Sequence, residues 1–216
     1  MKHPAPKELR IFRRQSPVRV LGPYQRAVIW VQGCEWACPG CIVPESWPAQ
    51  GGEVVSIEAL VSWILAQSNI EGITLSGGEP MLQASALVTL IDQVRKVRDL
   101  GVMCYTGYTL QGLQRQGTAA QQELLNCIDL LVDGPYQATQ HDNLLWRGSR
   151  NQKLQLLTSR YQSCLEQSLE EGDRSAGLEF FTSTDQEVSF TGVPEKADFR
   201  QQFEAALQAK GILVKV

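Results

Sequence analysis

The sequence predicts an α/β protein, namely an incomplete, open (βα) barrel of about six units with a mainly parallel sheet. Short apolar runs alternate with helical patterns along the chain. The runs are nearly unbroken by polar residues, as is typical of parallel strands buried on both faces. At roughly 30 residues per strand–helix unit, 216 residues hold fewer units than the eight that usually close a barrel. We therefore expect the sheet to remain open.

Four apolar runs indicate the buried strands, at residues 27–32, 72–76, 101–105 and 128–132. Between them, Ser56 is a candidate N-cap for a helix over 57–65, and an apolar stripe followed by Gly101 indicates a second helix over 87–97. Beyond Asp133 the pattern is weaker. There we expect strands at 153–157, 178–181 and 188–193 and helices at 161–171 and 199–210.

The composition fits one globular unit, with 43% hydrophobic and 20% charged residues. The net charge of −3 gives no basic field of the kind that holds a phosphate backbone, so nucleic acid is not an expected partner. The apolar run at 27–31 is too short to span a bilayer, and residues 1–14 lack the apolar stretch of a secretory signal. We expect no membrane association and a cytoplasmic location.

Three of the six cysteines crowd into one loop directly after the first predicted strand: Cys34, Cys38 and Cys41. Six cysteines are too sparse for a disulfide scaffold in a chain of this length, and thiolates are common ligands of iron–sulfur clusters and of zinc. Structural zinc normally takes four ligands, whereas only three are local here. Spacing alone leaves open a cluster, zinc completed from afar, or plain structural cysteines. A four-iron cluster on three cysteines would keep one iron open for a small molecule.

The second predicted strand ends in Ser76-Gly77-Gly78-Glu79-Pro80, at the edge of the sheet where the cysteine loop lies. Paired glycines allow the backbone to approach a ligand closely, and Pro80 fixes the exit from the turn. A phosphate loop is excluded, because neither Gly-Lys-Ser/Thr nor G-x-G-x-x-G is present. The alternative is a tight strand–helix turn with Glu79 near the helix start.

Together, the C-x3-C-x2-C loop and the Gly-Gly-Glu-Pro turn resemble the radical S-adenosylmethionine (SAM) superfamily. The resemblance implies that the cysteines bind a [4Fe-4S] cluster and that SAM chelates its open iron. One electron from the cluster would then yield methionine and a 5′-deoxyadenosyl radical that abstracts hydrogen. The cofactor-binding residues expected on this basis are Gly77, Gly78, Glu79, Pro80, Tyr105, Thr106, Gly107 and Asp133.

Other interpretations exist for several of these residues. Asp133 also suits a turn before Gly134-Pro135, and Tyr105 to Tyr108 also suit aromatic packing around a glycine turn. Trp36 and Trp47 either shield the cluster from solvent or pack as ordinary aromatic side chains.

Further motifs between about Val28 and Leu157 resemble the activating proteins of anaerobic ribonucleotide reductase. These motifs are Cys38-Pro39-Gly40-Cys41, Tyr105-Thr106-Gly107-Tyr108-Thr109, Leu131-Val132-Asp133-Gly134-Pro135-Tyr136 and Arg147-Gly148-Ser149-Arg150-Asn151-Gln152. The resemblance implies an oxidoreductase that installs a glycyl radical on a partner enzyme, with ferredoxin or flavodoxin as electron donor. No catalytic residue is assigned beyond the cluster and the cofactor. Arg147–Gln152 could bind an anion or a partner's main chain, or form a solvated loop.

The chain departs from that family at two places. Related activases often carry Gly-x-Gly-x-Arg before the first strand, whereas Gly22-Pro23-Tyr24-Gln25-Arg26 lacks the second glycine. Residues after about 158 have no counterpart in the compact reductase activases. We therefore expect a single radical-SAM domain over 1–216, with a core at about 20–157 and a carboxyl-terminal extension over 158–216.

Two alternative functions stay open at this point. A radical-SAM enzyme could act on a small molecule, as the 7-deazaguanine-forming enzymes do, or on a peptide. A non-enzymatic electron-transfer or zinc-binding module would need a fourth ligand and would not bind SAM.

Overall fold

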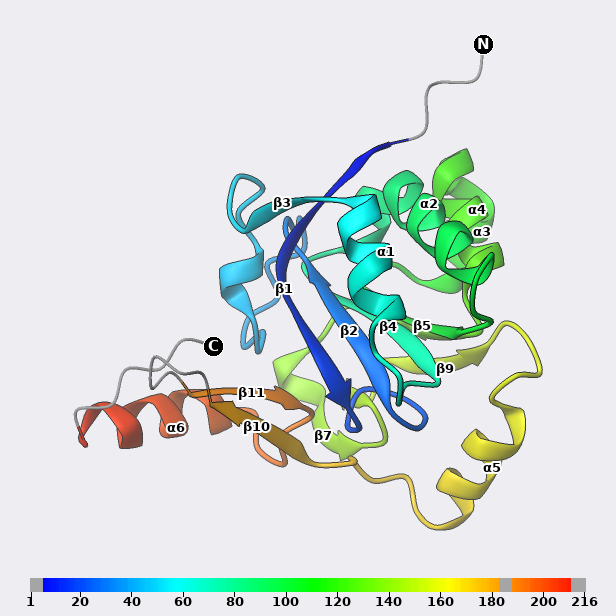
Figure 1. The fold of residues 1–216 in the computed structure, drawn as a ribbon. Helices are drawn as coiled ribbons and strands as arrows, with labels where there is room; N and C mark the ends of the chain where they lie inside the picture. Colours follow the sequence, from blue (N-terminus) through cyan, green and yellow to red (C-terminus); the bar gives the residue numbers. More distant parts are fainter. Residues whose placement is uncertain (1–5, 183–187, 211–216) are drawn as a thin grey trace.

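The computed structural model of the protein describes residues 6–182 and 188–210. At its centre lies a seven-stranded sheet in the order β3-β1-β2-β4-β5-β6-β9 (Figure 1). Its parallel strands are β2 (Arg26–Val31), β4 (Gly72–Gly77), β5 (Gly101–Thr106) and β6 (Leu130–Asp133). These are the four apolar runs of the sequence, and the mixed α/β fold with a large, mainly parallel sheet is confirmed.

The outer strands of the sheet are antiparallel. β1 (Glu8–Val18) pairs with both β2 and β3 (Glu53–Ser56), and β9 (Lys153–Leu156) pairs with β6. Four parallel strands are fewer than the about six units that chain length suggested. The difference arises because β1 and the segment after β9 do not form strand–helix units. Within the described residues, the outermost strands β3 and β9 do not pair with each other.

A layer of helices covers one face of the sheet (Figure 1). It consists of α1 (Ile57–Leu65), α2 (Ala84–Arg95), α3 (Leu110–Gln116) and α4 (Ala119–Cys127). The Ser56 hydroxyl caps α1 as predicted, accepting a 3.1 Å hydrogen bond from the Ala59 amide. Side chains alternate along β2, so that Ile29 packs in the core beneath the helices while Trp30 faces the opposite side.

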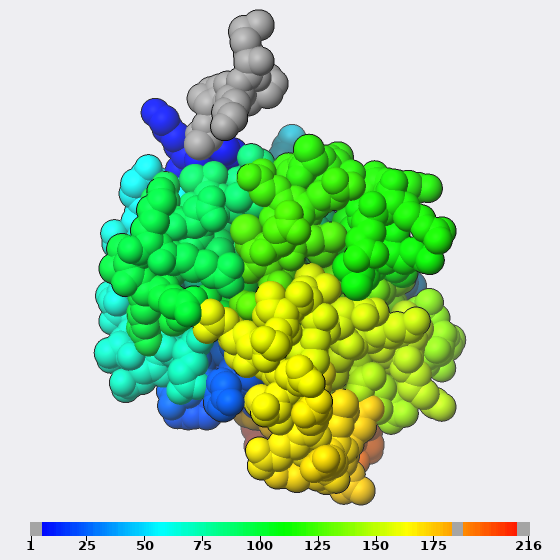
Figure 2. Space-filling model, turned by 90° about the vertical axis from the view of Figure 1, so that its right-hand side faces the viewer, coloured from blue at the N-terminus to red at the C-terminus, as the bar shows by residue number. Residues whose placement is uncertain are grey.

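The carboxyl-terminal part of the chain contributes to the opposite side of the sheet. There, Trp146 and Tyr161 pack against Met103 and Leu130 of the sheet. The elements of this part are β7 (His141–Leu144), β8 (Arg147–Ser149), α5 (Gln162–Glu170), β10 (Leu178–Thr182), β11 (Val188–Gly192) and α6 (Phe199–Gln208). Short 3-10 helices lie at η1 (Pro44–Ser46), η2 (Pro80–Gln83) and η3 (Ala138–Gln140). Figure 2 shows the segment around α5, in yellow, packed below the green helices on one side of the molecule.

Two sets of contacts hold the extension in place, one between β11 and α6 and one from α6 to the rest of the chain. Phe190 of β11 stacks edge-on against Phe199 of α6, with ring centroids 5.3 Å apart. The Arg200 guanidinium of α6 donates to the Ile42 carbonyl at 2.7 Å and pairs with Glu45 of η1. The extension is therefore anchored beside the loop that carries the cysteines.

The turn before β2 keeps a left-handed backbone although its second glycine is missing. Tyr24, in the place of that glycine, has φ of 59°, a conformation that L-residues rarely adopt. The turn leads into Arg26, a fully buried side chain that donates to the Thr74 hydroxyl at 2.6 Å and to the Tyr161 hydroxyl at 3.0 Å. This departure from the family pattern lies at the amino end of β2, away from the cysteines.

Among the helices of the described ranges, none combines the length and the apolar character that crossing a bilayer requires.

Candidate active site

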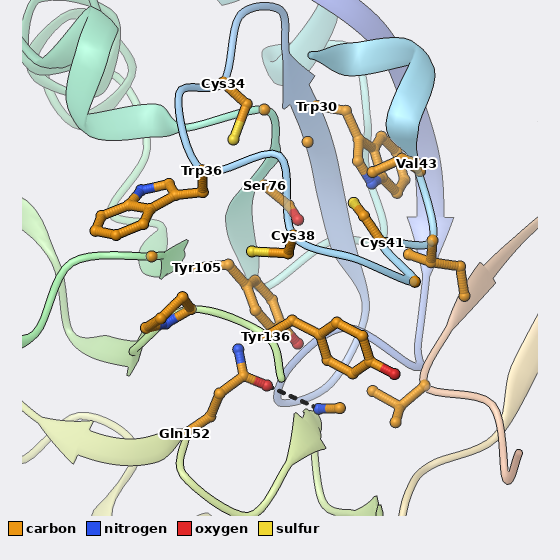
Figure 3. Close-up of a pocket in the computed structure, with 18 of the residues that line it drawn as sticks. Trp30, Cys34, Trp36, Cys38, Cys41, Val43, Ser76, Tyr105, Tyr136 and Gln152 are labelled. Carbon is orange, nitrogen blue, oxygen red and sulfur yellow. Dashed lines mark hydrogen bonds between the residues drawn. The ribbon is translucent and has the colours of Figure 1, made fainter. Parts of the chain in front are cut away.

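The three clustered cysteines line one cavity, of about 200 Å³, at the carboxyl end of the parallel strands. Cys34, Cys38 and Cys41 are partly buried and free, and they surround the space beside Ser76 (Figure 3). The carboxyl ends of β4 and β5 contribute Gly77 and Tyr105 to the same cavity. The carboxyl ends of β2, β4 and β5 thus meet at this cavity, and Gly134 to Tyr136, directly after β6, line it as well.

The cysteine loop is held in shape by its own backbone and by the segment around η1. Gly33 and Gly40 have positive φ of 99° and 78°, and so does Ala37, at 42°. The Cys34 amide donates to the Trp47 carbonyl at 3.0 Å, and the Gly33 amide donates to the Ser46 carbonyl at 2.8 Å. These bonds fix the conformation of the loop.

The donor set fits a four-iron cluster better than a single zinc ion. Within the described ranges, no three His, Cys, Asp or Glu side chains converge closely enough to hold one ion. A [4Fe-4S] cluster needs no such convergence, because each thiolate binds a different iron. His141 also lines the cavity, but its Nδ1 lies 3.1 Å from the Tyr136 hydroxyl and its Nε2 lies 3.3 Å from the Glu195 carbonyl. Neither nitrogen is free to complete a zinc site.

Burial raises the pKa of the Cys34 and Cys38 thiols. A bound cation would reverse this tendency, because a coordinating thiol is deprotonated. The remaining cysteines lie outside the cavity: Cys104 in the core beneath the helices, Cys127 at the end of α4 and Cys164 in α5.

The Gly-Gly-Glu-Pro turn packs directly against the start of the cysteine loop. The Gly78 amide donates to the Val31 carbonyl at 2.8 Å, and the Glu79 amide donates to the Gly33 carbonyl at 2.8 Å. A Cβ on Gly78 would lie 2.2 Å from the Gly33 carbonyl oxygen, closer than any real contact. The close backbone approach expected of the glycines is therefore made to the cysteine loop. Both Gly77 and Gly78 also face the cavity.

Glu79 connects three parts of the site through its buried carboxylate. It accepts hydrogen bonds of 2.8 to 2.9 Å from the Trp36 indole, the Thr106 hydroxyl and the amides of Met81 and Gly107. Burial raises the pKa of this carboxyl group, while the four donors act to lower it. The bond to Met81 caps η2, as the alternative interpretation of a helix-start glutamate expected. Glu79 thus holds the cysteine loop, its own turn and the end of β5 together.

The other predicted cofactor-binding residues divide into two groups. Tyr105, Thr106 and Gly107 line the cavity, and the buried Tyr105 hydroxyl has no hydrogen-bond partner among the described residues. Pro80 and Asp133 do not line the cavity. The Asp133 carboxylate accepts a 2.7 Å bond from the Leu110 amide, at the start of α3.

The segment Arg147–Gln152 is only partly in the site. Gly148 and Gln152 line the cavity, and the Gln152 side chain accepts a 3.0 Å bond from the Gly148 amide (Figure 3). Arg147 pairs instead with Asp173 outside the cavity. Trp36 and Trp47 both line it, and Trp36 also packs edge-on against Tyr108, so the shielding of a cluster stays a prediction.

Sequence reasoning missed part of the lining. Tyr136 was named only as part of a family motif, although its place shortly after the fourth strand could have assigned it to the site. Arg13 of β1 and the stretch from Phe190 to Pro194 carry no local signal, because they reach the cavity only through tertiary packing.

A family model described as a 4Fe-4S single cluster domain matches residues 20–155, which include the cysteine loop, the Gly-Gly-Glu-Pro turn and the end of β5. The fold and the site define an iron–sulfur enzyme of the radical-SAM class. Curated relatives make the assignment more specific. The anaerobic ribonucleoside-triphosphate reductase-activating protein of Vibrio cholerae is 35% identical over 156 residues, covering 68% of this chain and 98% of the relative. The chain belongs to this family of reductase-activating proteins.

Two further relatives with the same description agree. The protein of Escherichia coli K12 is 31% identical over 151 residues, covering 65% of this chain and 95% of the relative. The protein of Enterobacteria phage T4 is 31% identical over 140 residues, covering 62% and 86%. Among solved structures, Escherichia coli QueE matches at 19% identity with a TM-score of 0.40, covering 47% of this chain and 54% of that chain.

Proposed function

We propose that this protein installs a glycyl radical on an anaerobic ribonucleotide reductase, using a [4Fe-4S] cluster and SAM. One observation supports this most strongly: Cys34, Cys38 and Cys41 share a single cavity with the Gly-Gly-Glu-Pro turn and the end of β5. The relatives that are named as activating proteins of this reductase are matched over almost their whole length. In this proposal, the sheet serves as an incomplete barrel whose interior holds the reacting groups.

The chain's own residues have distinct tasks in this mechanism. The three cysteines hold the cluster, which together with SAM supplies a 5′-deoxyadenosyl radical when bound. Gly77 and Gly78 present their backbone to the cofactor, and Tyr105 offers a hydroxyl that has no partner in the described part of the chain. Trp30, Trp36 and Trp47 exclude water from the cavity.

Glu79 is a positioning residue in this proposal, because its carboxylate is already satisfied by four protein donors. Pro80 and Asp133 support the site from outside the cavity. We assign residues 1–216 to a single domain. Its carboxyl-terminal extension forms one side of the cavity. We take the electron donor to be a ferredoxin or a flavodoxin, and we place the activity in the cytoplasm.

The test is anaerobic reconstitution followed by incubation with SAM, a reductant and the reductase of the same organism. We expect about four irons per chain, 5′-deoxyadenosine and a glycyl radical detected by electron paramagnetic resonance. Alanine at Cys34, Cys38 or Cys41 should abolish all three signals. Cys127→Ser and Cys164→Ser are matched controls that should keep them. Stoichiometric zinc in the active protein would contradict the proposal.

A second function, radical chemistry on a small molecule or a peptide, is favoured by one observation. Phe190 to Pro194, Ala197 and Arg200 of the extension line the cavity and narrow it from one side. If such a substrate leads to 5′-deoxyadenosine and no reductase acquires a radical, this second function replaces the activase assignment.

A further inference from the structure

Arg13 brings a positive charge to the cavity from outside the motifs of the family. Its strand, β1, pairs antiparallel with β2, and Arg13 lies opposite Trp30. The guanidinium carbon lies 4.4 Å from the centroid of the Trp30 ring and 5.8 Å from that of Phe12. Both Arg13 and Trp30 line the cavity. The aromatic rings therefore hold the guanidinium in a fixed orientation at its wall.

Arg13 makes one side-chain hydrogen bond within the described ranges 6–182 and 188–210. Its Nη2 donates to the Phe190 carbonyl of β11 at 2.9 Å. Among the described residues, its Nε is buried and has no hydrogen-bond partner, and no carboxylate forms an ion pair with the guanidinium. Arg13 is partly buried, and the carboxylate that acts on its charge, Glu45, forms its ion pair with Arg200 instead. Leaving donors of a partly buried cation unused is costly, and a bound anion would relieve that cost.

The other positively charged side chain of the lining is already neutralised. Arg200 pairs with Glu45 and with Glu204, and it donates to the Ile42 carbonyl. Burial lowers the pKa of Arg13 to about 10, so its guanidinium remains protonated at neutral pH. Arg13 is thus the charged donor in this lining that a ligand can still use.

We infer that Arg13 is an anion-binding residue of the radical cavity and that its ligand is a carboxylate. A guanidinium matches a carboxylate through two parallel hydrogen bonds. The carboxylate comes either from the methionine part of SAM or from an acidic group of the substrate. The inference rests on the proposed function. It adds that Arg13 of β1 contacts the carboxylate and that the Phe190 carbonyl of the extension orients its guanidinium.

The experiment compares Arg13→Gln with Arg14→Gln in the reconstituted holoenzyme. Arg14 is the matched control because it is the next residue of the same strand, does not line the cavity and stacks over Trp63 of the helix layer at 5.5 Å. Equilibrium dialysis gives the dissociation constants of SAM and of decarboxylated SAM. Titration of the reductase gives its KM. Iron content and circular dichroism establish that each variant is folded and loaded, and Arg13→Lys tests retention of the charge.

If the cofactor supplies the carboxylate, Arg13→Gln weakens SAM binding at least about tenfold. Decarboxylated SAM then binds this variant and the unmodified protein equally well. If the substrate supplies the carboxylate, Arg13→Gln leaves SAM binding unchanged and raises the KM for the reductase at least about tenfold. In both cases Arg13→Lys recovers part of the loss, and Arg14→Gln stays within about twofold of the unmodified protein.

The inference fails if folded, cluster-loaded Arg13→Gln matches the unmodified protein within about twofold in both measurements, or if Arg14→Gln shows the same loss. Dialysis requires only the cofactor. A SAM-binding defect in Arg13→Gln, together with no glycyl radical on any reductase, would therefore refute the proposed function and leave the role of Arg13 intact.

Discussion

The Trp36 indole Nε1 donates a 2.9 Å hydrogen bond to Oε2 of Glu79, joining the cysteine loop to the turn after β4. The same ring packs edge-on against Tyr108, with ring centroids 5.1 Å apart. Trp36 thus has a polar contact that fixes the loop and an aromatic contact that fixes the ring. The two contacts can be separated by mutation.

Trp36→Phe removes the indole donor and keeps an aromatic ring against Tyr108. We expect a loss of about 1.5 to 3 kcal/mol in the free energy of unfolding, because a buried carboxylate loses one of its donors. Cofactor cleavage should slow while the iron content is retained. Chemical denaturation and 5′-deoxyadenosine assays measure these effects. Trp63→Phe, on α1, is the control, and an equal slowing there would contradict a specific role for Trp36.

Gly78→Ala forces the turn away from the cysteine loop, because the new Cβ would meet the Gly33 carbonyl oxygen at 2.2 Å. The expected cost is about 1–3 kcal/mol of stability, together with weaker SAM binding. Gly112→Ala serves for comparison, since its Cβ would lie 3.0 Å from the Thr109 hydroxyl oxygen and α3 gains a better helix former. Unchanged SAM binding in Gly78→Ala would show that the close approach is not needed.

Arg200→Ala cuts the link between α6 and the segment after the cysteine loop. The pair with Glu45 is partly exposed, so we expect only about 1 kcal/mol of lost stability. Hydrogen exchange should instead become faster in α6 and around η1, because the extension is released locally. Arg160→Ala breaks a comparable pair with Asp99 outside the cavity lining. Faster hydrogen exchange in α6 of the Arg160→Ala variant would mean that the effect of Arg200→Ala is not local.

Tyr24→Gly relieves the left-handed backbone at φ of 59°. The gain of about 1–2 kcal/mol from removing this strain is opposed by the greater freedom of glycine in the unfolded chain. The net shift in the melting temperature should stay within about 4 °C. Tyr24→Val should be destabilised, because a β-branched residue fits this conformation poorly. Cluster content should not change in either variant, since the turn is remote from the cysteines.

The parallel strands, the helices α1 and α2 and the cysteine loop could be predicted from the sequence because each carries a local signal. Each strand is an unbroken apolar run, Ser56 is a capping residue, and the three cysteines are close together. The strand β1 gave no such signal, since Arg10, Arg13 and Arg14 interrupt its apolar pattern. The helices α3 and α4 are short and rich in glutamine, so their apolar stripe is weak.

The parts of the site that were missed depend on contacts between distant segments. Nothing near Arg13 in the sequence indicates that the carbonyl of Phe190 and the ring of Trp30 enclose it. Asp133 illustrates the opposite case. Its position at a strand end was predicted correctly, but its carboxylate is directed to the Leu110 amide instead of the cavity.

The contacts that bring the extension to the cavity span much of the chain. Arg13 and Phe190 are 177 residues apart, and Ile42 and Arg200 are 158 apart. During synthesis on the ribosome, the cysteines therefore emerge long before β11 and α6 can close their side of the cavity. Iron and sulfide can then reach the thiols through a wider opening than the finished protein offers. Cluster loading should accordingly be faster in protein refolding from denaturant than in folded apoprotein, and Arg200→Ala should narrow that difference.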